Sequence, residues 1–142
     1  MFRILTDDMA VAPQIGRDDV AAAAQAGYRL IINNRPDGEE SDQPSAIDIG
    51  SEARSHGMDY IEIPVTHAGF SQPQVDAMVA ALENADGPVL AFCRSGTRSC
   101  LLWALAQARM GADCDAVAET AAAAGYDVGP VRQVMDLLQA QA

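Results

Sequence analysis

Strand-like and helix-like segments alternate along most of this chain, and their order limits the folds that it can adopt. Short apolar runs predict strands at residues 2–5, 9–13, 28–34, 58–65 and 88–92, the first two of them as short edge strands. Helical spacing, polar caps and glycine stops predict helices at residues 16–27, 46–57, 71–87, 99–111, 113–125 and 129–142. Parallel strands need crossover helices, and this alternation supplies them. We therefore expect an α/β fold with a mostly parallel central sheet flanked by helices.

The size of the chain suits one folding unit. Its 142 residues lie within the range of a single domain, and apolar residues make up 49% of them, which is enough for one hydrophobic core. The stretches rich in Gly, Pro and polar residues are short, so the composition is that of a globular chain and not of a disordered one. We expect a single domain over residues 1–142.

The charge balance limits the partners of the protein. The formal net charge is −11, and all nine basic residues are arginine. Nucleic acids and anionic membrane surfaces bind through clustered positive charge, so we expect this acidic chain to bind neither. No apolar run reaches the roughly 18–20 residues of a membrane span, and the N-terminus lacks the apolar core of a signal peptide. Three scattered cysteines indicate reduced thiols, and we expect a cytoplasmic protein.

Metal and cofactor signatures are missing from the sequence. The two histidines and three separated cysteines do not form a metal-ligand spacing. The chain also lacks a glycine-rich nucleotide-binding fingerprint. We expect neither a metal nor a cofactor.

One stretch combines the residue types of a nucleophilic site with a position where such sites form. Residues 93–99 read CRSGTRS and lie between the strand predicted at 88–92 and a predicted helix. The N–H groups of a loop curled at a helix N-terminus bind anions, and Gly96 permits that curl. A helix dipole, convergent N–H donors and nearby arginines all favour the thiolate form of a cysteine. Cys93 is therefore a candidate nucleophile, and Arg98 offers a charged fork for an oxyanion.

The remaining candidates lie in or near this loop. Ligands of a parallel sheet bind outside the carboxyl ends of its strands, which places the loops 35–45, 66–70 and 93–98 on one rim. The residues expected to form the oxyanion-binding loop are Arg94, Ser95, Gly96, Thr97 and Ser99. The Ser99 hydroxyl is expected to cap the helix and to bond the thiolate. Further candidates for an acid or a substrate contact are Asp37, Glu39, His67 and Arg35.

These motifs resemble two known groups of proteins. The pattern C-x-x-G-x-R-S after a buried strand resembles the active-site loop of rhodanese-type sulfurtransferases. The segments QIGRDDV, IINNRPDGEESDQPS, YIEIPV and GPVLAFCRSGTRSCLLWAL resemble the phosphatase-like domain of beta-lactamase hydrolase-like proteins, a family assigned to the protein tyrosine phosphatase superfamily. This resemblance implies a fold like that of the dual-specificity phosphatases, with Cys93 as nucleophile, residues 94–98 as oxyanion cradle and Arg98 as clamp.

Two features favour sulfur transfer over phosphate hydrolysis. Phosphatases of this superfamily have five residues between the cysteine and the arginine, whereas here Arg98 comes one residue earlier and Ser99 occupies the arginine position. The shorter loop presents a smaller ring of N–H groups, which suits a sulfur atom better than a phosphoryl group. Release of an alkoxide also needs a general acid, and the rim loop where an aspartate is expected reads THAGF and offers only His67.

The sequence leaves three functions open for Cys93. The first expectation is a sulfurtransferase that takes sulfane sulfur from a small donor as a persulfide and passes it to a thiol or cyanide-like acceptor. The alternative is a phosphatase that hydrolyses phosphomonoesters through a phosphocysteine. The third is a non-catalytic domain that binds an oxyanion or reports redox state. The expected partners are therefore a small anionic or sulfane-sulfur substrate and, for sulfur transfer, a thiol acceptor.

Overall fold

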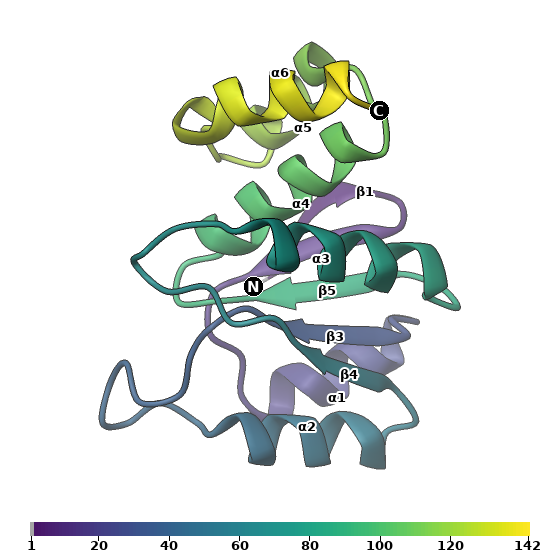
Figure 1. Cartoon of the computed structure of the whole chain (residues 1–142). Coiled ribbons are helices and arrows are strands. Elements are labelled where there is room, and N and C mark those ends of the chain that lie inside the picture. The colour runs from purple at the N-terminus through teal and green to yellow at the C-terminus, as the bar shows by residue number, and fades with distance from the viewer. Residues whose placement is uncertain (1) are drawn as a thin grey trace.

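Five strands form the central sheet in this computed structural model, which describes residues 2–142. The strands are β1 (Arg3–Thr6), β2 (Met9–Ala12), β3 (Leu30–Asn33), β4 (Asp59–Glu62) and β5 (Val89–Phe92). Their order across the sheet is β1-β2-β5-β3-β4 (Figure 1). β1 pairs with β2 antiparallel, and all other neighbours are parallel. The predicted α/β fold with a mostly parallel sheet is confirmed.

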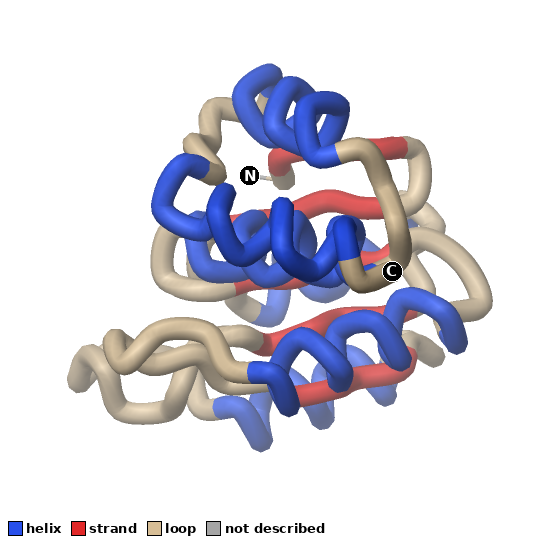
Figure 2. The backbone as a smooth tube through the Cα atoms, turned by 45° about the horizontal axis from the view of Figure 1, so that its top comes forward, coloured by secondary structure: helices blue, strands red, loops and turns tan. Residues whose placement is uncertain are grey.

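Helices cover both faces of the sheet. They are α1 (Arg17–Gln25), α2 (Ala46–Ser55), α3 (Gln72–Asn84), α4 (Thr97–Arg109), α5 (Cys114–Ala123), the 3-10 turn η1 (Gly129–Val131) and α6 (Arg132–Ala140). α1 and α2 lie on one face, α3 and α4 lie on the other, and α5 and α6 pack outside α4 (Figures 1 and 2). None of the helices in this described part of the chain has the length and apolar character that a bilayer span requires.

Each face of the sheet buries its own apolar cluster, and β5 contributes to both. Val89 and Ala91 join the cluster under α3 and α4, whereas Leu90 and Phe92 join the cluster over α1 and α2. Successive side chains of a strand point to opposite faces, so a strand covered on both faces is apolar throughout. The residue that follows β5 is therefore placed in the interior, between the layers.

The position of β2 differs from the prediction. The residues of Met9–Ala12 were expected to form an edge strand, but β2 lies between β1 and β5 and all four of its residues are buried. The physical reason is the β1 hairpin partner, which takes the edge and leaves β2 free to pair with β5. The parallel register sets Ala12 beside Phe92, so the carboxyl end of β2 also reaches the rim.

Candidate active site

The loop of residues 93–98, which we call the Cys93 loop, places a cysteine beneath the N-terminus of α4. Cys93 directly follows β5 and is fully buried. The helix was expected to begin near Ser99 but begins at Thr97, because Gly96, with a φ of +91°, reverses the chain directly before it. The Gly96 N–H donates a hydrogen bond to Cys93 Sγ at 3.1 Å. This N–H points at the sulfur, and such a bond is stronger to a charged acceptor than to a neutral one.

The surroundings of the sulfur are positive. The N–H groups of the first turn of a helix have no partner within the helix, and the helix dipole adds partial positive charge at that end. Arg98 lies in this first turn. A hydrogen bond to Glu39 raises the pKa of Arg98, and the nearby charge of Cys93 raises it further. Arg98 and the Cys93 sulfur therefore interact electrostatically.

The other two cysteines are poor nucleophiles by comparison. Burial raises the pKa of Cys100 to about 12, and the charge of Cys93 adds to this effect. Burial also raises the pKa of Cys114, which lies beside Asp136. Both thiols stay protonated near neutral pH, so Cys93 is the candidate thiolate of the chain.

Arg98 is held by the protein on one side and keeps donors for a ligand on the other. Its Nη1 donates to Glu39 Oε2 at 2.8 Å and to the Val65 carbonyl at 2.7 Å, and its Nη2 donates to Glu39 Oε1 at 2.8 Å. A guanidinium has five N–H groups, so the Nε–H and one Nη2–H remain for other acceptors. Glu39 thus fixes the orientation of a side chain that can still bind an oxyanion.

Arg35 contacts the same carboxylate from the protein interior. Its side chain is only 3% exposed, and its Nε donates to Glu39 Oε1 at 2.9 Å. Its Nη1 and Nη2 donate to Gln14 Oε1 at 3.0 Å and to Glu40 Oε1 at 2.8 Å. The hydrogen bond from Arg98 lowers the pKa of Glu39 to about 2, with Arg35 contributing and burial opposing. Glu39 therefore carries no proton near neutral pH, and it cannot serve there as the general acid considered in the sequence analysis.

The two remaining acid candidates are Asp37 and His67. The Asp37 carboxylate accepts a hydrogen bond from the backbone N–H of Ala46 at 2.8 Å. Because Ala46 is the first residue of α2, this bond stabilises the start of that helix. His67 is exposed on the rim loop that follows β4. A carboxylic acid aimed at Cys93 is thus not found among these predicted residues.

The other predicted side chains of the Cys93 loop face outward. The Arg94 side chain is 67% exposed, and its Nε lies 3.3 Å from Glu40 Oε1. The Ser95 and Thr97 hydroxyls are 3.1 Å apart and hydrogen-bond to each other. The oxyanion cradle predicted for these residues would therefore use their backbone N–H groups and not these side chains.

Ser99 has a different role from the expected one. The residue that caps α4 is Gly96, and the Ser99 hydroxyl donates to Asn34 Oδ1 at 2.7 Å. Asn34 in turn donates through its Nδ2 to the Ile63 carbonyl at 2.9 Å. The expected cap was wrong because Ser99 is the third residue of α4, and the expected thiolate bond was wrong because its single hydroxyl proton is already given to a buried amide. Asn34 was missed, although a polar pair at the end of an apolar strand could have indicated it.

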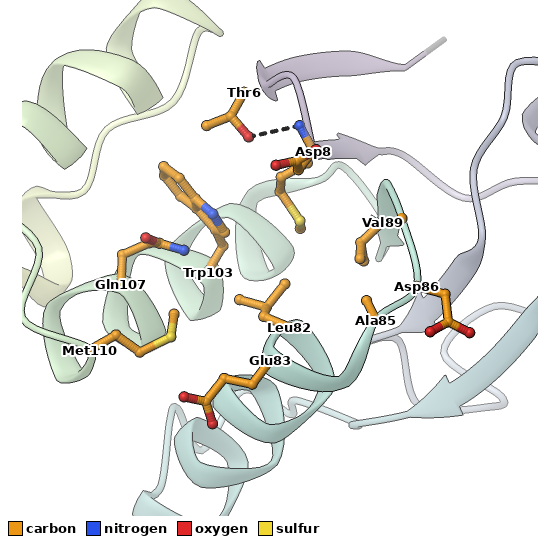
Figure 3. A pocket seen from close by; sticks show the side chains of 12 residues that line it. Thr6, Asp8, Leu82, Glu83, Ala85, Asp86, Val89, Trp103, Gln107 and Met110 are labelled. Carbon is orange, nitrogen blue, oxygen red and sulfur yellow. Dashed lines mark hydrogen bonds between the residues drawn. The ribbon is translucent and has the colours of Figure 1, made fainter.

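A cavity of about 680 Å³ lies at the opposite end of the sheet. Figure 3 shows Asp8, Trp103 and Val89 among the side chains around it. Val89 is the first residue of β5, whereas Cys93 follows the last. This cavity is therefore separate from the Cys93 loop.

The ion pairs of Glu39 are expected to stabilise the fold in a pH-dependent way. The folded pKa of about 2 lies below the ordinary value of 4.5, so this stabilisation is complete above about pH 4.5 and is lost as the pH falls toward 2. Glu39→Gln should lower the free energy of unfolding at neutral pH by about 2 kcal/mol, and the deficit should shrink below about pH 4.5. Urea denaturation at several pH values measures both quantities.

Glu52→Gln is the matched control, because Glu52 is paired with His56 and Arg17 at the surface. Its loss is expected to stay below about 0.5 kcal/mol. Equal losses in the two variants, or a Glu39→Gln deficit that does not change between neutral and acid pH, would contradict the assigned role of Glu39.

Comparison with known proteins identifies relatives along most of the chain. A family model for the "beta-lactamase hydrolase-like protein, phosphatase-like domain" matches residues 1–112. A beta-lactamase hydrolase-like protein of Xylella fastidiosa is 35% identical over 126 residues, which are 88% of this chain and 29% of that protein. The chain therefore spans less than a third of the length of this curated relative.

Solved structures show the same fold. A candidate phosphatase of Neisseria meningitidis superposes with a TM-score of 0.82 and 33% identity, covering 95% of this chain and 96% of that one. Tk-PTP in its active form superposes with a TM-score of 0.75 at 14% identity, covering 99% and 97%, and this likeness concerns the fold alone. The fold is that of the protein tyrosine phosphatase-like and dual-specificity phosphatases, as the sequence resemblance implied.

Proposed function

We propose, because this chain belongs to the phosphatase-like domain family of the beta-lactamase hydrolase-like proteins, that it is a cysteine-dependent phosphatase whose nucleophile is Cys93. The observation that carries the proposal is the hydrogen bond from the Gly96 N–H to Cys93 Sγ, beside the charged fork of Arg98. The spacing of the Cys93 loop alone favours sulfur transfer. The descriptions of the relatives, among them a candidate phosphatase at 33% identity, favour the phosphatase alternative.

The reaction has two displacement steps at phosphorus. The Cys93 thiolate attacks a small phosphomonoester, the S–P bond forms, the P–O bond to the leaving group breaks, and the leaving oxygen takes a proton from water. Water then attacks the phosphocysteine, the S–P bond breaks, and phosphate departs while the thiolate is restored. The Cys93 loop N–H groups and the free edge of Arg98 stabilise the equatorial oxygens in both transition states.

The leaving group must depart without protonation by a general acid, because the carboxylates near the site already bind arginines or a backbone N–H. Glu39 is ionised between two arginines, Asp37 holds the start of α2, and Glu40 contacts Arg35 and Arg94. General acids contribute about 10²- to 10⁴-fold when a poor leaving group departs. The expected substrates are therefore phosphates of acidic alcohols, such as aryl phosphates.

The rate of phosphate release tests this substrate class. An aryl phosphate should be hydrolysed at least about 100-fold faster than an alkyl phosphate, because no acid assists the alkoxide. His67→Ala should change neither rate by more than about twofold, since the preference rests on a missing acid. Comparable rates for the two substrates, or a loss of alkyl phosphate hydrolysis alone in His67→Ala, would contradict the proposal and assign an acid role to His67.

Sulfur transfer is the second candidate, and the spacing of the loop favours it. Four residues separate Cys93 from Arg98, and expulsion of sulfite needs no acid. The thiolate would attack the sulfane sulfur of thiosulfate, forming a persulfide as the bond to the sulfonate sulfur breaks and sulfite leaves. An acceptor thiolate would then attack the outer sulfur and release Cys93. Sulfite formation from thiosulfate and a thiol, faster than aryl phosphate hydrolysis, would reverse the order of the two functions.

A non-catalytic role is the third outcome of the same assays. A protein that turns over neither substrate but still binds phosphate or sulfate would be an oxyanion-binding domain. The match covers only 29% of the Xylella fastidiosa relative, so the activity of that whole protein is not carried over to this chain.

A further inference from the structure

We propose that Tyr126 is a positioning residue for the Cys93 loop: its hydroxyl fixes the peptide unit whose N–H faces the Cys93 sulfur. Tyr126 lies between α5 and the 3-10 turn, outside residues 1–112 that the family model matches. It was not among the candidates that the sequence indicated. The proposal rests on the function proposed above for Cys93, and it adds a residue from the C-terminal helical layer to that site.

Two hydrogen bonds meet on one peptide unit. The Tyr126 hydroxyl donates to the Ser95 carbonyl at 3.1 Å, and the N–H of the next residue, Gly96, donates to Cys93 Sγ at 3.1 Å. The C=O and N–H of a trans peptide lie in one plane and point in opposite directions. A donor that holds the carbonyl on one side therefore also holds the direction of the N–H on the other.

The close approach of Tyr126 to Gly96 makes this coupling direct. Gly96 has a φ of +91°, and a Cβ built on it would lie 2.2 Å from the Tyr126 hydroxyl oxygen. The loop at this position thus has room for glycine alone, with the phenol packed against its backbone. Tyr126 is 8% exposed, so water has little access to replace the hydroxyl as a donor.

Tyr126 is itself held in place by β1. The Arg3 guanidinium lies 5.2 Å from the centre of the Tyr126 ring, and Arg3 Nη1 donates to the Ala124 carbonyl at 3.1 Å. Burial raises the pKa of Tyr126, and the Arg3 guanidinium opposes this effect only in part. The hydroxyl therefore keeps its proton and remains a donor when Cys93 is ionised.

The charged and titratable groups that bear on Cys93 come from three elements. Arg98 and Cys100 lie on α4, and Tyr126 follows α5. Glu39 acts from the rim through its bonds to Arg98. Removing the Tyr126 hydroxyl leaves all the other groups in place, so a change in the ionisation of Cys93 can be attributed to the loop geometry.

Tyr126→Phe removes only this hydroxyl, and Tyr28→Phe is its control. Tyr28 is on the far side of the sheet, where its ring packs edge-on against Phe2. The readout is the ultraviolet absorbance of the thiolate as a function of pH, with the Cys93→Ser protein as baseline. Cys100 and Cys114 do not contribute near neutral pH, because burial raises the pKa of both thiols. The titration needs no substrate, so it does not depend on which reaction the enzyme catalyses.

We expect the curve of Tyr126→Phe to move to higher pH, with a thiolate fraction about three- to tenfold lower at the acidic end. The value of kcat should fall by a similar factor with KM nearly unchanged, and Tyr28→Phe should match the wild type. If Tyr126→Phe titrates like the wild type, the positioning role is overturned while the proposed function stands. If the wild type has no thiolate at neutral pH, the proposed function fails, and the role of Tyr126 fails with it.

Discussion

Cys93→Ser is expected to lower kcat for aryl phosphate hydrolysis by at least about 10⁴-fold, because a serine hydroxyl is not ionised at neutral pH and makes a far weaker nucleophile. The Gly96 N–H that stabilises a sulfur anion would then face a neutral oxygen. Thiosulfate-dependent sulfite release, where the wild type supports it, should be lost to the same extent. Initial rates on both substrates measure the loss.

Cys114→Ser is the matched control for this substitution. Cys114 is also a buried cysteine, but it lies at the start of α5 beside Asp136. Its replacement should leave kcat within about twofold of the wild type. Retention of more than about a hundredth of the activity in Cys93→Ser would mean that another group is the nucleophile, whatever the fold suggests.

Arg98→Lys should lower kcat/KM by about 10²- to 10³-fold, although the positive charge is kept. A lysine cannot donate through two parallel N–H groups to Glu39 and still present an Nε–H edge to an oxyanion. Loss of one donor to a developing oxyanion has effects of about this size in other enzymes. Steady-state kinetics with an aryl phosphate measure the change.

Arg109→Lys is the matched control for Arg98→Lys, because it makes the same substitution on the same helix. Arg109 lies at the last residue of α4, where it pairs with Asp76 at the surface. Its substitution should leave kcat/KM unchanged within about twofold. Similar losses in the two variants would indicate that Arg98 acts through the stability of α4 and not through the bound anion.

The fold could be predicted from the sequence because its pattern is local and strong. Buried strands such as β3 and β5 are continuous apolar runs, and helices such as α3 carry a serine cap and an early proline. The position of β2 could not be predicted, because four apolar residues fit an edge strand or an interior one equally well. Only the long-range pairing with β5 distinguishes these two cases.

The Cys93 loop was visible in the sequence because its residues are contiguous. Cysteine, glycine and arginine stand within six positions, so their joint action follows from local geometry. The groups that support them come from distant segments: Asn34 is 65 positions from Ser99, and Tyr126 is 31 from Ser95. Neither residue type is rare, and nothing in a single sequence connects such pairs.

Glu39 shows that the charge state of a rim residue depends on contacts that the sequence does not indicate. Its place on a polar rim loop made it a candidate general acid, and the structure brings it into contact with Arg98 across 59 positions. That contact keeps it ionised near neutral pH, because two guanidinium groups stabilise its charged form. The role depends on its neighbours in space, which the sequence of the loop does not indicate.

The most direct test of the account is the identity of the group bound to Cys93 during turnover. The protein is mixed with an excess of aryl phosphate, or separately with thiosulfate, quenched in acid within one turnover, digested and analysed by mass spectrometry. We expect the peptide that contains Cys93 to carry one phosphoryl group after the first reaction, and no adduct in Cys93→Ser. If Cys93 forms only a persulfide from thiosulfate and no phosphoryl adduct, the result would support sulfur transfer by the same residue. Continued turnover with an unmodified Cys93 peptide in both reactions would contradict it.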